Sequence, residues 1–409
     1  MADELDVWLR GRRVALVSRQ RDRLDLTYTE AALAEHQLGT PLLSLSLPLV
    51  PQRYTKGRVR PFLDGLLPEG APRRVAAEDF DLLASDTFGL LRALGRECAG
   101  AIIVQPAGDD PPPEPSTLAA EPLDDDELEA LVANLRNAPL GTSARVRVSL
   151  AGVQEKLVLT RMPDGRWGSP VDGAPSTHIL KPELAEYPAT VANEAFCMRT
   201  ARHLGLPAAH VETTSVGGRP LLVVERFDRE VAADGTVVRL HQEDLAQATG
   251  IPPEKKYQTD GGPSLARIAG VLQSVAAPGA REALLRMVTL NVVVGNGDAH
   301  AKNFSLLHHP AGTVDLAPAY DVLSTLQYGD DRLAMYVDDL RRTDRVTGAR
   351  LLNEAVAWGL GRDRAMQVMT VLLDGLPEAT ARAREETDNV PDDLGRLVDA
   401  QAERLRRTS

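Results

Sequence analysis

The segment "NGDAHAKN" gathers side chains that could move a proton or hold a metal ion. It follows an apolar run that ends at Val294. Asp298 and Asn303 have the spacing that phosphoryl-transfer enzymes use for a catalytic carboxylate and a magnesium-binding amide. We therefore predict that Asp298 acts on an attacking hydroxyl group and that Asn303 offers its side-chain oxygen to Mg²⁺.

This chemistry requires a second metal-binding carboxylate downstream, and "VDLAPAYDVLST" supplies Asp321. Simpler interpretations stay open for both segments. The first could be a polar turn with His300 and Lys302 in solvent, and Asp321 could be a helix N-cap. Zinc hydrolysis is disfavoured, because no pair of histidines has the spacing that places both on one helix face.

Lysine is scarce in this chain, so the positions that keep it are informative. Only six of the 46 basic residues are lysines, and Lys156, Lys181 and Lys302 lie in candidate motifs. Lysine offers a compact ammonium group where arginine offers a wide planar one. Lys181 ends a predicted strand in "THILKP" and could reach nucleotide phosphates. Glu194, on the next predicted helix, is a candidate to orient it; a surface Lys and a surface Glu are the alternatives.

Two further segments could bind a nucleotide. "SLAGVQEK" resembles a phosphate loop between two strands, in which Gly152 permits close backbone approach and successive N–H groups bind an anion. "VVERFD" follows a buried strand, and backbone groups of Glu225 and Phe227 could pair there with an adenine edge. The alternatives are an ordinary hairpin glycine and a plain strand end with Arg226 and Asp228 in solvent.

The order of these pieces is more informative than any one of them. Along the chain come a phosphate loop, a strand lysine, a helix glutamate, a hinge, the Asp–Asn loop and the metal carboxylate. Independent coincidences in this order are improbable. The order therefore predicts a phosphotransferase that uses a nucleotide and Mg²⁺.

The elements that would position these residues predict more than one domain in a chain of 409 residues. Residues 1–105 have the pattern of short strands and helices, with a hairpin that turns at Gly11. Residues 106–124 are rich in Pro and acidic side chains and predict a linker. Strands dominate in residues 125–240 and helices in residues 241–409. We expect an α+β, two-lobed fold with an all-α C-terminal lobe.

Composition limits the partners and the compartment. The net charge of −12 disfavours a protein that grips nucleic acid over its whole surface, so a DNA contact would be local or made by a partner. Cys98 and Cys197 are isolated, which predicts neither a disulfide framework nor a zinc site. The chain begins without a secretory pattern and has no run long enough to span a bilayer. We expect a cytoplasmic protein with no membrane contact.

Together these motifs resemble the HipA family of bacterial toxin serine/threonine kinases. The resemblance rests on "SLAGVQEK", "THILKP", "NEAFCMR", "VVERFDR", "HQEDLAQATG", "KYQTDGGPS", "NGDAHAKNFSLL" and "LAPAYDVLST", and on "FLDGLLPEGAPRR" in the N-terminal part. It implies a protein-kinase-like fold with an added N-terminal subdomain. It also implies an ATP- and Mg²⁺-dependent kinase that phosphorylates a serine of an aminoacyl-tRNA synthetase, typically the glutamyl enzyme.

The resemblance further implies a biological setting. Blocked tRNA charging would arrest translation and produce growth arrest or persistence. A small helix-turn-helix antitoxin of the HipB type would neutralise the kinase, and the pair would repress their own operator. The acidity of this chain fits such a pair, because the antitoxin would make most of the DNA contacts.

The resemblance assigns a role to each candidate residue. Asp298 would be the catalytic base, with Asn303 and Asp321 as metal ligands. Ser149 would be autophosphorylated, and its charge would expel the phosphate loop from the nucleotide site and inactivate the kinase. The nucleotide contacts that the resemblance implies are Ala151, Gly152, Val153, Gln154, Glu155, Lys156, Lys181, Glu225, Arg226, Phe227, His300, Lys302, Asn303, Tyr320 and Asp321.

Two other functions stay open at this point. A small-molecule phosphotransferase of the aminoglycoside-kinase type also uses an Asp–Asn loop of this spacing, and it would have no requirement for Ser149. A non-catalytic pseudokinase that acts only as a co-repressor would bind nucleotide without transferring phosphate.

Overall fold

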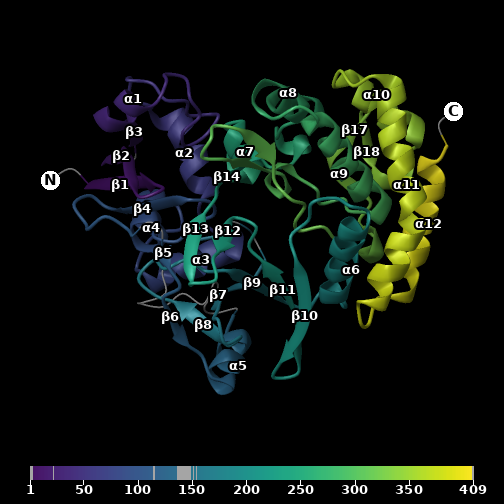
Figure 1. The fold of residues 1–409 in the computed structure, drawn as a ribbon, viewed down its shortest axis with the longest axis horizontal. Coiled ribbons are helices and arrows are strands. Elements are labelled where there is room, and N and C mark those ends of the chain that lie inside the picture. Colours follow the sequence, from purple (N-terminus) through teal and green to yellow (C-terminus); the bar gives the residue numbers. More distant parts are fainter. Residues whose placement is uncertain are drawn as a thin grey trace. The chain divides into compact units, whose positions relative to one another are not determined.

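The computed structural model describes residues 3–21, 23–113, 116–135, 149–150, 152 and 154–407. The chain divides into two compact units (Figure 1). The first unit comprises Met1–Lys181 and Glu225–Glu254, and the second comprises Pro182–Val224 and Lys255–Ser409. Each unit is therefore assembled from two stretches of chain, and the predicted kinase N-lobe, residues 125–240, contributes to both. The predicted domain boundaries stay a prediction.

A four-stranded antiparallel sheet begins the first unit. Its order is β3-β2-β1-β4, with β1 (Asp3–Leu9), β2 (Arg12–Gln20), β3 (Arg23–Tyr28) and β4 (Ile102–Pro106). Arg10 and Gly11 form the turn between the first two strands, with φ values of 50° and 71°. Two successive positive φ angles are the geometry of a tight hairpin turn, so the predicted turn at Gly11 is confirmed.

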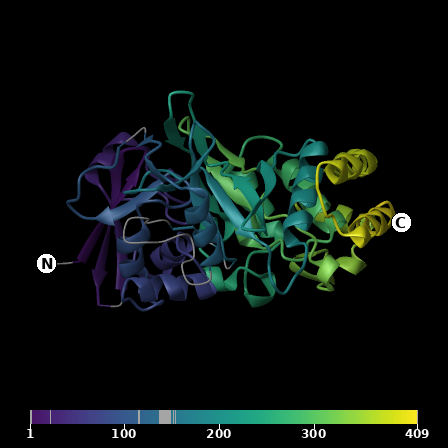
Figure 2. The same cartoon turned by 90° about the horizontal axis from the view of Figure 1, so that it is seen from below.

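Four helices accompany this sheet: α1 (Glu30–Glu35), α2 (Lys56–Gly65), α3 (Gly70–Asp79) and α4 (Thr87–Leu94). Helix α2 contacts β3 and helix α4 contacts β4. Figure 2 shows the purple strands of the sheet beside the dark-blue helices of the same unit. Leucine and valine side chains from both layers form one apolar core between them.

Most of the remaining strands of the first unit pair in two groups. One has the order β6-β8-β7-β9, with β6 (Ala120–Pro122), β7 (Leu157–Arg161), β8 (Trp167–Pro170) and β9 (His178–Pro182). The other has the order β12-β13-β5, with β5 (Ser116–Thr117), β12 (Arg229–Val231) and β13 (Thr236–Arg239). Strands β5 and β6 belong to the segment predicted as a linker. Residues 116–122 are therefore edge strands of these sheets rather than a free connection.

Shorter elements complete the first unit. Helix α5 (Asp125–Ala133) begins with a capping box between Asp124 and Glu127, so the acidic run there starts a helix. Strand β14 (His241–Asp244) leads into the short helix α7 (Leu245–Ala248). The strand expected just before the phosphate loop lies in residues 141–148, outside the described part of the chain.

Helices dominate the second unit, as predicted. They are α6 (Thr190–His203), α8 (Leu265–Val275), α9 (Ala280–Val294), α10 (Gly348–Ala357), α11 (Arg362–Glu385) and α12 (Asp392–Leu405). Helix α11 packs against α6, α9 and α10, and α12 packs against α9 and α10. Figure 1 shows this helical group in teal, green and yellow. Helix α9 is buried along most of its length because neighbours cover it on several sides.

The second unit also contains strands, so the expectation of an all-helical C-terminal lobe needs correction. Hairpin β10 (Val211–Val216) and β11 (Arg219–Glu225) follows α6 and falls in the predicted strand-rich residues 125–240, so the correction rests on later strands. Two further antiparallel pairs lie after α9: β15 (Ser305–His308) with β16 (Val314–Leu316), and β17 (Arg332–Val337) with β18 (Leu340–Arg342). The first of these pairs begins directly after the predicted catalytic loop.

Candidate active site

The end of helix α9 fixes the start of the loop that carries Asp298. Gly295 ends the helix in the left-handed conformation, with φ of 73°, and its N–H donates to the carbonyl groups of Asn291 and Val292. A left-handed residue after a helix is usually glycine, because a Cβ atom is disfavoured there. The N–H of Asn296 also donates to the Asn291 carbonyl, at 2.8 Å. The loop therefore leaves a buried helix in a defined direction.

Buried amide groups then position Asp298 itself. The backbone N–H of Asp298 donates to Oδ1 of Asn296 at 3.1 Å. Nδ2 of Asn296 donates in turn to Oδ1 of Asn291 at 2.7 Å, inside the helix. The hydroxyl of Tyr257 donates to Oδ1 of Asp298 at 2.8 Å. These three neighbours were not predicted as site residues, although Tyr257 lies in the quoted "KYQTDGGPS" motif.

The surroundings of Asp298 change its acidity. Burial raises the pKa of this carboxyl group to about 6, the hydrogen bond from Tyr257 lowers it, and the negative charge of Asp321 raises it further. A general base works best when its pKa lies near the operating pH. Asp298 is therefore mostly ionised at neutral pH, yet it binds a proton far more readily than an exposed aspartate.

Asn303 and Asp321 carry oxygen donors of the kind that a hard metal ion binds. Nδ2 of Asn303 donates to the carbonyl oxygen of Asp298 at 3.1 Å, which fixes the amide and directs its Oδ1 away from that carbonyl. Asp321 lies in the left-handed region, with φ of 57°, a strained conformation for a residue other than glycine. Its charge acts on both Asp298 and His300. One amide oxygen and one carboxylate in this setting fit Mg²⁺, which prefers oxygen ligands.

His300, Lys302 and Tyr320 lie in the same unit as these groups. His300 and Lys302 are buried, which excludes the alternative that both are in solvent. Burial and the charge of Lys256 lower the pKa of His300 to about 3, so its ring is neutral at physiological pH. The hydroxyl of Tyr320 donates to the carbonyl of Lys302 at 2.6 Å. The structure thus brings together every predicted residue of the catalytic loop.

Helix α6 supports this loop from another direction. Nδ2 of Asn193 donates to the carbonyl of Ser324, and its Oδ1 accepts from the N–H of Ser324, at 3.0 and 2.9 Å. This pair of bonds fixes the backbone just after Asp321. Glu194 is 4% exposed, so the alternative of an ordinary surface glutamate is wrong. Asn193 was missed, although it stands next to Glu194 in the quoted motif.

The predicted phosphate-binding residues lie in the first unit. Lys181 is 9% exposed on β9, so it is not a surface lysine. Lys156 is equally buried, and its ammonium group lies so close to Gly152 that a Cβ atom at that position would collide with it. Gly152 also has φ of 129°, which side chains disfavour. Gln154 and Glu155 are partly exposed, whereas Ala151 and Val153 lie outside the described residues.

Ser149, the predicted autophosphorylation site, is fully buried in the first unit. Its hydroxyl donates to the carbonyl of Leu66 at 2.6 Å, and its N–H donates to the carbonyl of Glu97 at 2.7 Å. The N–H of Glu69 donates to the carbonyl of Gly152 at 3.1 Å. The bonds to Leu66 and Glu69 hold Ser149 and Gly152 against the motif "LLPEG", for which the sequence suggested no role.

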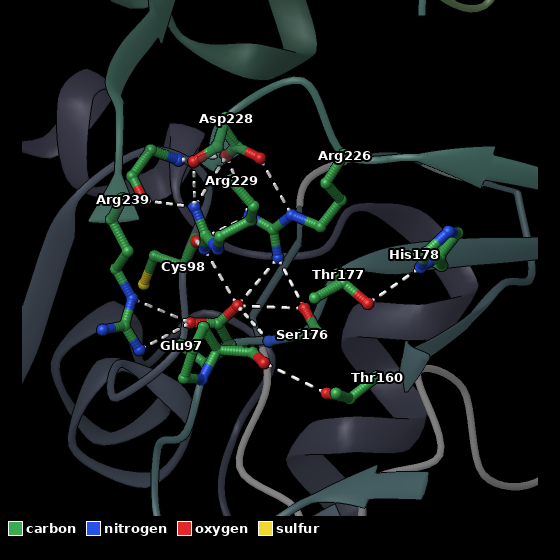
Figure 3. Close-up of polar contacts among 12 residues, drawn as sticks. Glu97, Cys98, Thr160, Ser176, Thr177, His178, Arg226, Asp228, Arg229 and Arg239 are labelled. Atoms are coloured by element: carbon green, nitrogen blue, oxygen red, sulfur yellow. Dashed lines mark hydrogen bonds and ion pairs between the residues drawn. The ribbon is translucent and has the colours of Figure 1, made fainter. Parts of the chain in front are cut away.

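The predicted hinge, Glu225 to Phe227, differs from expectation in its central side chain. Arg226 is 3% exposed, and its guanidinium donates to Glu97, Ser176 and Asp228 (Figure 3). All of these groups are buried. The alternative that Arg226 and Asp228 lie in solvent is therefore wrong. Arg226 can contact a nucleotide only through its backbone, because its side chain is occupied in this cluster.

Known protein families match both parts of the chain. The family described as HipA N-terminal domain matches residues 5–105, and the HipA-like C-terminal domain matches residues 148–380. The second match alone covers more than half of the sequence. The chain belongs to the HipA family. This family of toxin kinases is the one that the sequence motifs resemble, and the α+β fold expected from that resemblance is confirmed.

Individual HipA relatives extend over nearly the whole chain. A putative kinase, Y4mE, of Sinorhizobium fredii is 40% identical over 96% of this chain and 94% of its own length. The serine/threonine-protein kinase toxin HipA of Shewanella oneidensis is 31% identical over 84% of this chain and 81% of its own.

A solved structure supports the same assignment. The complex of HipA, HipB and operator DNA from Shewanella oneidensis contains a chain that matches with a TM-score of 0.81 at 27% identity. The match covers 98% of this HipA-family chain and 95% of that chain. Within the described residues, no helix is both long and apolar enough to cross a bilayer.

Proposed function

We propose that this chain is an ATP- and Mg²⁺-dependent serine/threonine protein kinase, the toxin of a type II toxin–antitoxin system. The observation that carries the proposal is the arrangement around Asp298 in the second unit. Phosphoryl transfer requires a base and ligands for a metal ion. Asp298 offers a buried carboxylate with a pKa of about 6, and Asn303 offers an amide that the Asp298 carbonyl orients. Asp321 offers a second carboxylate, on a strained backbone.

In this reaction the hydroxyl oxygen of a serine attacks the γ-phosphorus of ATP. The bond between that phosphorus and the oxygen bridging it to the β-phosphate breaks, and ADP leaves with the bond electrons. Asp298 accepts the proton of the attacking hydroxyl. Its raised pKa suits this role, because a carboxylate with a pKa of about 6 accepts the proton more readily than an ordinary aspartate does. Tyr257 holds the carboxylate in a fixed orientation through Oδ1.

Asn303 and Asp321 would hold the metal, which supplies charge neutralisation of the phosphates when it is bound. Lys181, Lys156 and the backbone of the loop around Gly152 would bind phosphate oxygens, and the backbone at Glu225 and Phe227 would pair with the adenine. His300 would contribute a neutral ring next to the phosphates, so the positive charge there would come from Lys302.

We further propose that the substrate is a serine of an aminoacyl-tRNA synthetase, most simply the glutamyl enzyme, so that phosphorylation arrests translation in the cytoplasm and produces persistence. The partner would be a helix-turn-helix antitoxin like HipB. A HipA chain similar to this one was solved together with HipB and operator DNA, which supports that partner. The net charge of −12 supports a complex in which the antitoxin makes most of the DNA contacts.

Ser149 would inactivate the kinase when phosphorylated. The buried hydroxyl has room for a hydrogen bond to Leu66 but is enclosed by protein, so the segment must leave this position before it can be modified. A phosphoserine carries between one and two negative charges near neutral pH and cannot return to a site without solvent. The phosphate loop would then stay displaced from the nucleotide.

The test is phosphorylation of the purified protein with Mg²⁺ and ATP. We expect mass spectrometry to find phosphate on Ser149. Asp298→Ala should reduce the rate on the order of a thousand-fold, because it removes the base from the transition state. Asp315→Ala, at an exposed carboxylate on β16, is the matched control and should keep the wild-type rate.

Three outcomes would count against the proposal. Full activity of Asp298→Ala would remove its catalytic role. Phosphate transfer to an aminoglycoside or another metabolite, with no effect of Ser149→Ala, would favour a small-molecule kinase. Nucleotide binding without any transfer would favour a pseudokinase that acts as a co-repressor.

A further inference from the structure

Five charged side chains of the first unit form a cluster that is almost without solvent. Glu97, Arg226, Asp228, Arg229 and Arg239 are each at most 6% exposed. Figure 3 shows Arg226 and Arg229 between the carboxylates of Asp228 and Glu97, with Arg239 on the far side of Glu97. Three guanidinium groups therefore accompany two carboxylates in a buried site.

Glu97 is the common partner in this cluster. Its Oε1 accepts from Nη1 of Arg226 and Nη2 of Arg229, both at 2.9 Å. The same oxygen accepts from the N–H and the hydroxyl of Ser176, at 3.0 and 2.9 Å. Its Oε2 accepts from Nη2 of Arg239 at 3.1 Å. The Glu97 side chain thus bonds to the first residue of β12, Arg229, and to the last residue of β13, Arg239. It also bonds to Arg226 and Ser176 in the same unit.

Arg226 is the partner that bears on function, since it is the middle residue of the proposed adenine hinge. Its backbone N–H donates to the carbonyl of Thr177 at 2.9 Å, and its side chain is fixed by Glu97 and Asp228. The chain turns directly after Arg226, where the N–H of Arg229 donates to the carbonyl of Arg226 at 3.3 Å. Fixing Arg226 therefore fixes the course of the backbone at its neighbours Glu225 and Phe227, the residues that would pair with adenine.

The cluster is not easily explained by stability alone. Buried ion pairs cost a large desolvation energy, and well-packed apolar residues of similar volume often stabilise a protein equally well. The charged groups add a fixed side-chain orientation, because a carboxylate and a guanidinium hold each other through several bonds of defined geometry. A fixed orientation of Arg226 matters if the backbone groups of Glu225 and Phe227 must pair with the planar adenine base.

We propose that Glu97 is a positioning residue for nucleotide binding: it fixes the Arg226 side chain and thereby the hinge backbone that would hold adenine. Glu97 lies within the match to the HipA N-terminal domain, residues 5–105, whereas Arg226 lies within the match to the HipA-like C-terminal domain, residues 148–380. The N-terminal domain would thus be part of the nucleotide site's support. This inference rests on the proposed function, which assigns adenine to Glu225 and Phe227.

The test shortens the Glu97 side chain while keeping its charge. Glu97→Asp withdraws the carboxylate by one methylene group, too far to keep all of its bonds to Arg226 and Ser176. Glu243→Asp is the matched control. Glu243 is 1% exposed in the same unit, and it accepts from the hydroxyl of Ser44 at 2.5 Å and the N–H of Leu45 at 2.9 Å, two residues outside the Glu97 cluster.

Two measurements separate positioning from folding. The first is the dissociation constant for a non-hydrolysable ATP analogue with Mg²⁺, by calorimetry. We expect it to rise about tenfold in Glu97→Asp and less than twofold in Glu243→Asp, while both variants lose thermal stability. The second is autophosphorylation against ATP concentration, in which KM should rise and the maximal rate should stay close to that of the wild type, because the hinge contacts the base and not the transferring phosphate.

A Glu97→Asp protein that is less stable but binds the analogue like the wild type would overturn the inference, because Glu97 would then be structural only. If Glu97→Asp does not fold, Ser176→Ala replaces it: this change removes the hydroxyl that bonds both Glu97 and Arg226, and unchanged affinity there would have the same meaning. A wild-type protein that binds no nucleotide would instead refute the proposed function.

Discussion

Two buried acidic sites of this chain differ in what surrounds their carboxylates. Burial alone would raise the pKa of Glu97, but the charges of Arg229, Arg239 and Arg226 outweigh it, and the pKa lies below its usual value. Asp228 shows the same balance between burial and arginine charge. At Asp298 burial dominates, since a tyrosine hydroxyl and the charge of Lys256 offset it only in part, and the pKa rises to about 6.

The difference separates a structural site from a reactive one. The carboxylates beside the arginines are held permanently ionised, so they fix geometry but cannot exchange protons near neutral pH. The groups around Asp298 offset its negative charge only in part, so its carboxylate can still bind a proton or a cation. Perturbed acidity of this second kind is typical of functional sites, whereas the first kind is also common in structural ion networks.

The largest expected effect comes from the same isosteric change at both sites. Asp228→Asn leaves buried arginines without their counter-charge and should cost about 3 to 5 kcal/mol of unfolding free energy. Asp298→Asn should cost little, because it removes a charge that burial disfavours. Chemical denaturation followed by tryptophan fluorescence measures both, since Trp8 and Trp167 lie in the first unit and Trp358 in the second.

Activity should show the opposite order in the same two variants. Asp298→Asn should abolish autophosphorylation, while Asp228→Asn should retain a measurable rate under conditions in which it is folded. Equal losses of stability in the two variants would contradict the distinction, as would full activity of Asp298→Asn.

The pH dependence of stability should also separate the two sites. The folded pKa of Asp298 is raised from 3.8 to about 6, so its contribution is fully present below pH 3.8 and is lost as the pH rises through 6. The loss is at most about 3 kcal/mol, at roughly 1.4 kcal/mol for each pKa unit. Glu97 and Asp228 have lowered values, so their contributions are present at neutral pH and lost on acidification.

Unfolding free energies of the wild type and Asp298→Asn, compared between pH 4 and 7, measure this term. The wild type should lose stability relative to the variant as the pH rises. EDTA should be present, because a metal ion at Asp321 would favour the ionised form of Asp298. Parallel pH profiles would show that the folded pKa of Asp298 is not raised.

The sequence could predict features that depend on nearby residues, but not those that depend on residues far apart in the chain. Asp298 and Asn303 could be predicted as site residues because their spacing lies within one short segment, and the turn at Gly11 because a tight hairpin constrains its residues. The strands within residues 116–122 were missed, because their pairing partners lie far along the chain and their Pro-rich composition favours a loop.

The Glu97 cluster and the supporting amides could not be predicted for the same reason. Glu97 and Arg226 are 129 positions apart, and Asn193 and Ser324 are 131 apart. A single sequence carries no local pattern that links such pairs. The sequence offered Arg226 as part of the hinge or as a charge in solvent, and only the tertiary structure shows the buried carboxylates that neutralise it.

Lys302→Arg should have the next largest effect, about a tenfold loss of turnover. Lys302 is 7% exposed, and its own carbonyl is held by Tyr320, so a longer and planar side chain has little room to keep its charge in place. Lys255→Arg is the control, since Lys255 is exposed. Steady-state rates at saturating ATP measure the effect, and unchanged kinetics in Lys302→Arg would remove the argument for a compact charge at this position.

Tyr257→Phe should have the smallest effect. The change removes one hydrogen bond to Oδ1 of Asp298, worth about 1 kcal/mol, and keeps the aromatic edge contact with His300, whose ring centre lies 5.2 Å away. Because that bond lowers the pKa of Asp298, its loss should raise the pKa and move the acidic limb of the rate profile to higher pH. Rates near pH 8 should fall only a few-fold, through looser orientation of the carboxylate.

Tyr336→Phe, at a partly exposed tyrosine beside Arg341, should leave the profile unchanged. A Tyr257→Phe profile that coincides with the wild type would mean that burial and the neighbouring charges set the acidity of Asp298 without the tyrosine, and the contrast with the Glu97 site would then rest on the arginines there.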